Sequence, residues 1–282
     1  MLTRSFIHMP RVGPITERKL WDCGICSWHD LLSRPQSAPV GPACRDRICI
    51  GIERSQQALR DKDWMFFYSS LPSSEQWRML SLPAGRTAYL DIETTGLTQG
   101  YDRITCIGLY DGQRARAYVR GRDLEQFAHD IQGYDLLVTY NGKSFDVPFI
   151  RRELRVALDV PHVDLRHVCA SVGLHGGLKG AERLAGIKRS SDLDGVDGFV
   201  AVMLWAEYEK SGDPRALETL IAYNLEDTIN LLPLSQAAWN RKLPARFPEL
   251  RVKVCASRPR LPCRPDKALV RRLVASAGAG RW

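Results

Sequence analysis

Three short segments of this 282-residue sequence place acidic side chains where they could bind a metal ion. In 89-YLDIETTGLTQG-100, Asp91 and Glu93 stand two residues apart at the end of an apolar run. Side chains at i and i+2 of a strand point the same way, so this pair would project together from a sheet. The segments YNGKSFD and AYNLED add Asp146 and Asp227. Acidic groups on buried elements are costly unless something neutralises them, so we expect these four carboxylates to share cations.

The ligand set favours a hard cation. Oxygen ligands without Cys or His suit Mg²⁺ or Mn²⁺. Asp146 follows a turn and begins a helix, where the helix macrodipole favours the ionised form. Tyr223 and Asp227 lie four residues apart on a helix and therefore share one face. Offsetting four converging negative charges takes roughly two divalent ions, the arrangement that catalyses in-line displacement at phosphorus.

The elements that position these groups follow a definite order. Residues 87–93, 103–112 and 114–120 have the pattern of short strands, with an Asp-Gly turn between the last two, which indicates an antiparallel meander. LEQFAHDI is helical, YDLLVTYNG is a strand, FDVPFIRREL opens a helix, HVDL is a short strand, and residues 165–239 have a helical pattern. The order β-β-β-α-β-α-β-α predicts an α/β protein with an RNase H-like mixed sheet flanked by helices, although several α/β folds share such an order.

The motifs DIETTG, YNGKSFD and YNLED resemble the three exonuclease motifs of the DEDD superfamily of 3′→5′ exonucleases. Within it the chain is most similar to the YprB-type RNase H-like proteins, from about Thr87 to Leu234. HVDLRHV, GGLKGAERLAGI and GVDGFVAVMLW resemble the middle segment of that family. The superfamily divides by the residue that orients the attacking water, either a Tyr four residues before the last Asp or a His five before it. Tyr223 and Ala222 occupy these positions, so the chain resembles the Tyr (DEDDy) branch.

The resemblance implies a role for each motif residue. The implied metal ligands are Asp91, Glu93, Asp146 and Asp227. One ion would lie between Asp91 and Asp227 and activate a water that Tyr223 positions, and a second near Asp91 would stabilise the leaving oxygen. Glu93 would also accept a hydrogen bond from the terminal 3′-hydroxyl. The implied activity is release of 5′-mononucleotides from 3′ ends.

Residues beside the motifs are candidates for nucleic-acid contact: Thr94, Thr95, Gly96, Leu97, Asn141 and Phe145. By the same resemblance, Leu97 wedges against the last base while Asn141 and Phe145 line the neighbouring wall, and stacking of this kind tolerates any base. Asn141 could instead only shape the turn before Asp146. Asp164 in HVDL is either an outer group of the site or the cap of the next helix.

Charge is unevenly distributed. The net charge is +8, and residues 241–282 contain twelve Lys or Arg against Glu249 and Asp266, a balance of +10 that leaves −2 for the rest. This Pro-containing segment is expected to be a basic tail that contacts a polyanion, or a solvated tail kept soluble by charge. We expect a core domain at residues 87–240, preceded by a helical module at 1–35 and an extension that packs on the core at 36–86.

The N-terminal module resembles a helix-hairpin-helix. FIHMPRVGPITERKLWDCGI has the Gly-Pro turn and helical spacing of such a unit, whose glycine-rich turn presents backbone amides to a phosphate. The usual pattern has Pro-Gly-x-Gly, and Arg11 replaces the first Gly. Arg11 could contact phosphate directly, or the module could be purely structural.

Cys23, Cys26, Cys44 and Cys49 approach the spacing of a zinc site. Gly24 and Ile25, between the first two, already serve the turn, so buried or incidental thiols are favoured over a structural Zn²⁺ or Fe–S site.

These features together predict a metal-dependent exonuclease acting on nucleic acid. No apolar run is long enough to cross a membrane, and the first residues lack a secretory core, so we expect a reduced, cytoplasmic protein. Single-stranded DNA ends are the favoured substrate. The alternatives are an RNase that trims RNA 3′ ends, a structure-selective nuclease, or a non-catalytic nucleic-acid-binding module.

Overall fold

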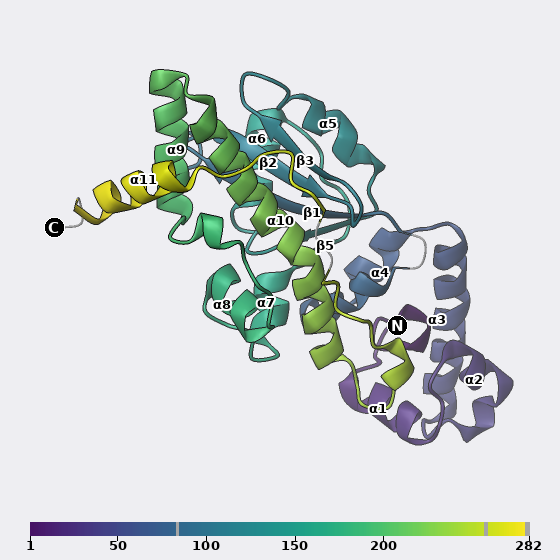
Figure 1. Cartoon of the computed structure of the whole chain (residues 1–282). Coiled ribbons are helices and arrows are strands. Elements are labelled where there is room, and N and C mark those ends of the chain that lie inside the picture. Colours follow the sequence, from purple (N-terminus) through teal and green to yellow (C-terminus); the bar gives the residue numbers. More distant parts are fainter. Residues whose placement is uncertain (83–84, 257–258, 280–282) are drawn as a thin grey trace. The chain divides into compact units, whose positions relative to one another are not determined.

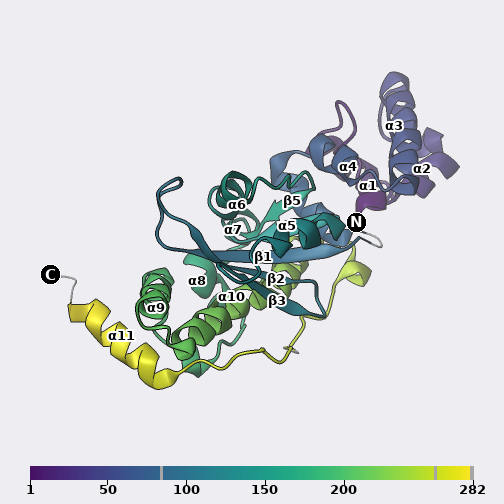
Figure 2. The ribbon, with the colours of Figure 1, turned by 90° about the horizontal axis from the view of Figure 1, so that it is seen from above.

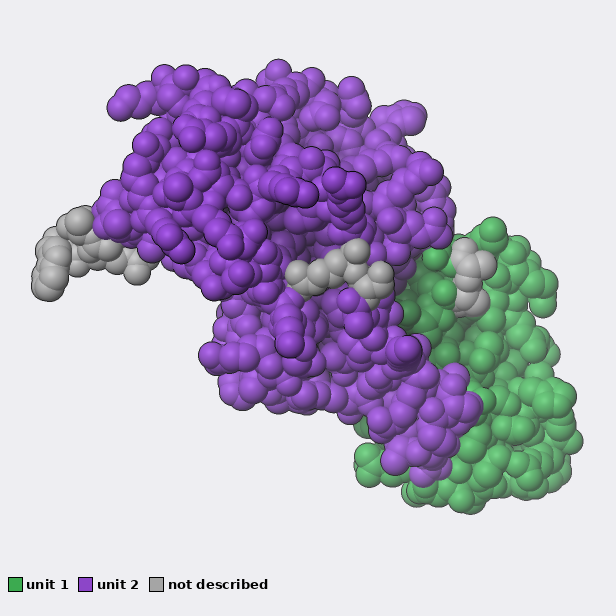
Figure 3. Space-filling view, viewed as in Figure 1, with its two compact units in different colours: residues 1–85 green, residues 86–282 purple. Residues whose placement is uncertain are grey.

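The computed structural model describes residues 1–82, 85–256 and 259–279. The chain divides into two compact units, Met1–Gly85 and Arg86–Trp282 (Figure 3). None of the helices in the described ranges combines the length and the apolar character needed to span a bilayer.

Unit 1 is helical. Its helices are α1 (Pro14–Asp22), α2 (Trp28–Ser33), α3 (Pro42–Arg60) and α4 (Trp64–Ser70), with 3-10 turns at Leu2–Arg4, Pro35–Ser37 and Ser73–Ser81. Ser27 caps α2 and Asp63 caps α4, each by accepting a hydrogen bond from a backbone amide of the first turn. The helices predicted within residues 15–21 and 27–32 are α1 and α2.

Residues 42–60, within the extension expected at 36–86, form the 19-residue helix α3. Pro42 is the first helical residue, a position where proline is favoured because the missing N–H has no partner there in any case. Ile48, Ile52 and Ser55 lie buried at helical spacing on one face. The expected extension therefore contains a long helix with one buried face.

Unit 2 contains a five-stranded mixed sheet (Figure 1). The spatial order is β3-β2-β1-β4-β5, with antiparallel pairing of β1 with β2 and of β2 with β3, and parallel pairing of β1 with β4 and of β4 with β5. The strands are β1 (Thr87–Thr94), β2 (Ile104–Tyr110), β3 (Ala115–Val119), β4 (Leu136–Thr139) and β5 (His162–Asp164). This confirms the predicted α/β, RNase H-like sheet.

Helices cover both faces of this sheet (Figure 2). α10 packs against β1 and β2 on one side, and α5 and α6 lie on the other. The helices of unit 2 are α5 (Gln126–Asp130), α6 (Asp146–Leu154), α7 (Leu165–Ala170), α8 (Gly177–Leu184), α9 (Gly198–Ser211), α10 (Pro214–Lys242) and α11 (Lys267–Ala279), with 3-10 turns at Ile131–Gly133, Ser191–Leu193 and Pro248–Leu250.

Side chains of β1 point alternately to the two faces of the sheet, and this alternation determines which of them face α10 and which face α5 and α6. Leu90 and Ile92 belong to the core cluster that includes Phe127 of α5 and Phe149 of α6. Because successive strand residues point to opposite faces, Asp91 and Glu93 project to the α10 side.

The predicted basic tail is partly a packed segment of unit 2. Leu269, Val270 and Leu273 of α11 are buried, and α11 contacts α9. Arg272 pairs with Glu207 of α9 at 2.8 Å, and Lys267 pairs with Asp192 at 2.7 Å. The apolar residues at helical spacing account for this packing, since they can only be buried against another element.

Candidate active site

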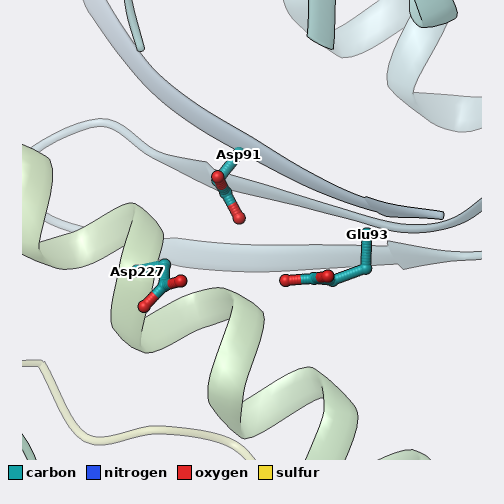
Figure 4. A group of neighbouring side chains, drawn as sticks. All are labelled: Asp91, Glu93 and Asp227. Carbon is teal, nitrogen blue, oxygen red and sulfur yellow. The ribbon is translucent and has the colours of Figure 1, made fainter. Parts of the chain in front are cut away.

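Three of the predicted acidic residues form a compact cluster. Carboxylate oxygens of Asp91, Glu93 and Asp227 lie within 4.8 Å of one another, and no other such group of His, Cys, Asp or Glu was found among the described residues. Asp91 and Glu93 come from β1 and Asp227 from α10, and their side chains point toward one another (Figure 4). A set of carboxylate oxygens without nitrogen or sulfur fits a hard divalent cation.

Asp146 lies beside this cluster at the first position of α6. Its Oδ1 accepts a hydrogen bond from the backbone N–H of Ile92, the residue between Asp91 and Glu93, at 3.1 Å. Asp146 is therefore fixed to β1 next to the other three acids, although its oxygens lie outside the tight group.

Burial and mutual repulsion raise the proton affinity of the cluster. The pKa values of Asp91 and Glu93 are raised well above their usual range, first by burial and then by the charges of the neighbouring acids. Burial raises the pKa of Asp146 to about 7. Desolvation outweighs the backbone hydrogen bonds that favour the ionised carboxylate, so burial dominates the pKa of Asp146 although the residue begins α6. A bound divalent ion would reverse this balance by favouring the charged forms.

Gly108 allows α10 to reach the strand. It lies opposite Asp91 in the β1–β2 register, and a Cβ added to it would lie 2.6 Å from Oδ1 of Asn224 on α10. Any larger residue would push α10, and with it Asp227, away from Asp91. This glycine was not predicted from the sequence, since a lone Gly in a strand carries no sign of what approaches it.

Asn224 fixes the orientation of Asp91. Its fully buried side chain donates from Nδ2 to Oδ2 of Asp91 at 2.9 Å and to the Asp91 backbone oxygen at 3.2 Å. The sequence feature that could have identified Asn224 is its position within the YNLED motif. Asn224 thus leaves the second oxygen of Asp91 available for a ligand.

Tyr223 lies on α10, four residues before Asp227, and is buried. Burial and the charges of Asp227, Glu93 and Asp91 raise the pKa of its phenol far above the usual value. The phenol therefore stays protonated at neutral pH.

The end of β1 and the loop that leads to β2 contain four of the predicted contact residues. Thr94 Oγ1 donates to the backbone oxygen of Gly96, and Thr95 Oγ1 donates to Asp102 at 3.0 Å, so both hydroxyls hold the loop itself. Leu97 is 83% exposed, and Tyr101, which was not predicted from the sequence, is 89% exposed. The loop that follows β1 thus presents two large side chains to solvent.

The turn before Asp146 is held by Asp164. Asp164 accepts hydrogen bonds from the backbone N–H of Asn141 at 2.7 Å and of Arg166 at 3.0 Å, which makes it the cap of α7. Asn141 has a φ of 68° and accepts a hydrogen bond from Arg166 Nη1 at 2.6 Å. Phe145 packs on Phe149, with ring centroids 4.9 Å apart. Asn141 and Asp164 thus shape the turn, and Phe145 contributes to its packing.

Two predicted sites belong to unit 1. Arg11 is exposed and has a φ of 64°, the left-handed conformation that the usual Gly of a helix-hairpin-helix would adopt. Cys23, Cys26, Cys44 and Cys49 do not come together as a group of three or more ligands among the described residues.

Two cations near the cluster were not predicted from the sequence. Arg189 is ion-paired with Asp227, and Lys179 of α8 lies 5.3 Å from the centre of the Tyr223 ring. Both follow or lie within GGLKGAERLAGI, a segment quoted only for its resemblance. Lys179 and Arg189 lie far from the acids in the sequence, so the sequence alone does not indicate that they approach the cluster.

Comparison with known proteins agrees with this fold. Residues 88–239, more than half of the chain, match the family model described as the RNase H superfamily. The chain belongs to this superfamily, and its core is an RNase H-like nuclease fold with an acidic cluster that could bind a divalent metal.

Two individual proteins are similar to the chain. Uncharacterised protein YprB of Bacillus subtilis (strain 168) is 29% identical over 169 residues, which cover 52% of this chain and 40% of YprB. The chain thus spans well under half of that relative. A family B DNA polymerase from the archaeon Pyrobaculum calidifontis has a TM-score of 0.43 and 15% identity, over 57% of this chain and 26% of the polymerase.

Proposed function

We propose that the protein is a metal-dependent 3′→5′ exonuclease of the DEDDy type that releases 5′-mononucleotides, with single-stranded DNA ends as its preferred substrate. The observation that carries the proposal is the convergence of Asp91, Glu93 and Asp227 within 4.8 Å, with Asp146 hydrogen-bonded to the same strand. Membership of the RNase H superfamily supports a nucleic-acid substrate.

Asp91, Glu93, Asp227 and Asp146 would hold divalent cations, two in number, preferably Mg²⁺ or Mn²⁺. Such ions, when bound, activate a water and neutralise charge on the phosphate. Asn224 keeps Asp91 oriented for this task. The protonated hydroxyl of Tyr223 would orient the water, and its burial and its interaction with the charges of the three acids support this role.

The loop after β1 would receive the end of the strand. Leu97 wedges against the terminal base, and the exposed Tyr101 offers a second surface for stacking. Glu93 accepts a hydrogen bond from the free 3′-hydroxyl. These contacts favour a strand that ends in the site over one that passes through it.

The direct test uses purified full-length protein with Mg²⁺ or Mn²⁺ and 5′-labelled single strands of DNA and RNA. A ladder that shortens from the 3′ end supports the proposal, and the faster of the two strands identifies the sugar preference. Asp91→Asn serves as the inactive control, because it removes a metal-ligand charge without removing volume.

Two further substrates separate an exonuclease from an endonuclease. A 3′-terminal phosphate should inhibit, since it removes the donor hydroxyl and places negative charge beside Glu93. Covalently closed single-stranded circles should survive. If the protein cut circles as fast as linear strands, and Asp91→Asn abolished this cutting, the site would belong to a structure-selective endonuclease.

A further inference from the structure

Asp227 is ion-paired with an arginine. The guanidinium of Arg189 donates from Nη2 to Oδ1 of Asp227, one of the carboxylates that the proposed function assigns to metal. The Arg189 side chain is 17% exposed and that of Asp227 9%, so the pair is largely shielded from water. A hydrogen bond between two charged groups in such surroundings is among the stronger ones in proteins.

The other edge of the guanidinium is held separately. Nη1 of Arg189 donates to both oxygens of Glu182 on α8, at 2.8 and 3.1 Å. Glu182 is fully buried and also accepts a hydrogen bond from Asn230 Nδ2 at 2.8 Å. The bond to Asp227 can therefore break while Arg189 stays charged and anchored on Glu182.

The backbone next to Arg189 is also fixed to α10. The N–H of Ser190 donates to Oε1 of Glu226 at 2.7 Å, and Glu226 directly precedes Asp227. Arg189 is thus held in reach of Asp227 from two sides, by the Glu182 carboxylate and by its own backbone. A surface arginine that met Asp227 by chance would have neither restraint.

We propose that Arg189 is a built-in counter-ion that competes with the divalent metal for Asp227, with Glu182 as the anchor that receives it when metal binds. The guanidinium offsets part of the repulsion among the acids in the metal-free protein and lowers the affinity of the site for metal. The inference rests on the proposed function, because it concerns the same metal site.

The test is the affinity of the full-length protein for Mn²⁺ alone, measured by isothermal titration calorimetry without nucleic acid. Arg189→Gln should bind Mn²⁺ at least about tenfold more tightly than wild type, since a competing charge-assisted hydrogen bond is gone. Arg116→Gln is the matched control. Arg116 lies on the outer strand β3 and pairs with Asp130 at 2.8 Å. The control should leave the affinity unchanged.

Arg189→Gln leaves Glu182 buried without its cation and could fail to fold. Glu182→Gln combined with Arg189→Gln removes both charges, while the new amide oxygen at position 182 can still accept from Asn230, and this double variant should show the same tightening. Unchanged or weaker Mn²⁺ affinity in either folded variant overturns the proposal, as does equal tightening in Arg116→Gln.

A spectroscopic measurement separates competition from a purely structural salt bridge. In ¹⁵N-labelled protein, Mg²⁺ should shift the guanidinium signal of Arg189, assigned by its absence from the double variant. A signal that does not move when Mg²⁺ saturates the site overturns the proposal and leaves the proposed function intact. If wild type binds no Mn²⁺ at all, the proposed function fails together with it.

Discussion

The two units each bury carboxylates, and they treat them differently. In unit 1, Glu17 accepts hydrogen bonds from the backbone N–H groups of Phe6 and Ile7 at 2.7 and 3.0 Å, and pairs with Arg78 at 2.7 Å. In unit 2, Asp91 and Glu93 face other acids, and their pKa values are strongly raised. The charge and the hydrogen-bonding capacity of Glu17 are met by other residues of unit 1, so Glu17 stabilises the fold. The acidic cluster instead requires protons or a cation from solution.

This contrast indicates how a chemical site can be recognised among buried charges. A buried ion pair with all its hydrogen bonds made is costly to break and offers nothing to a ligand. Carboxylates held together against their repulsion have an affinity for cations instead. Arg189 neutralises only part of the negative charge of the cluster, and it does so only at Asp227.

The largest expected effect is on hydrolysis. Asp91→Asn should reduce 3′→5′ hydrolysis to background, since it removes a metal-ligand charge, and Asp227→Asn should do the same. Because Asp91→Asn also removes repulsion within the cluster, the melting temperature of the metal-free protein should not fall. Near wild-type hydrolysis by Asp91→Asn would remove this cluster from the chemistry.

The counterpart in unit 1 is Glu17→Ala, which should affect stability without affecting chemistry. Removing one partner of a buried pair costs about 3 kcal/mol or more, because Arg78 is left buried without its main counter-ion. Urea denaturation measures the loss, and the rate of hydrolysis per folded molecule should be retained. A variant of normal stability would show that Glu75, the second partner of Arg78 at 2.7 Å, is sufficient by itself.

Tyr223→Phe should produce an intermediate effect. Losing the hydroxyl that positions the water should slow the single-turnover rate by roughly 10²-fold, while binding of nucleic acid changes little. The ring and its packing remain, so the melting temperature is the control. An unaltered single-turnover rate would reduce Tyr223 to a packing residue.

The proton affinity of the cluster predicts a pH dependence. The pKa of Asp146 is about 7 in the folded protein, whereas an unfolded Asp has one of about 3.9. The folded state therefore holds a proton that the unfolded state has released, and this contribution to stability is lost as pH rises through about 7. Without metal, wild type should lose more thermal stability than Asp146→Asn between acidic and neutral pH. Parallel stability curves would contradict the raised pKa, and Mg²⁺ should diminish the difference.

The smallest effect concerns the basic segment after α10. Arg251 and Lys253 are exposed. If they contact phosphates of a single strand, each substitution by Gln should flatten the slope of log affinity against log salt by about 0.7. Binding at several salt concentrations measures it, with the exposed Lys210→Gln on α9 as control. Equal slopes in wild type and both tail variants would make these charges part of a solvated surface.

The order of elements along the chain and the shared face of Asp91 and Glu93 could be predicted from the sequence because both are local properties. The period of two along β1 sends Asp91 and Glu93 to one face wherever the strand lies. The oxygen-only ligand set specifies a hard cation by side-chain chemistry alone. The helix α3 was missed because a proline is as common at the start of a helix as in a linker. The burial of Ile48 and Ile52 decides between these two outcomes.

Tertiary structure decided what surrounds the acids. Asn224 reaches Asp91 across 133 positions of sequence, Gly108 matters only because α10 crosses the sheet there, and Arg189 meets Asp227 across 38. The raised pKa of Asp146 has the same origin, since desolvation depends on every element packed around the group. Residue types and local periodicity specify which acidic side chains are present and which of them share a face of β1. Only the packing of α10 on β1 and β2 determines how close they lie and how much charge remains for a metal to neutralise.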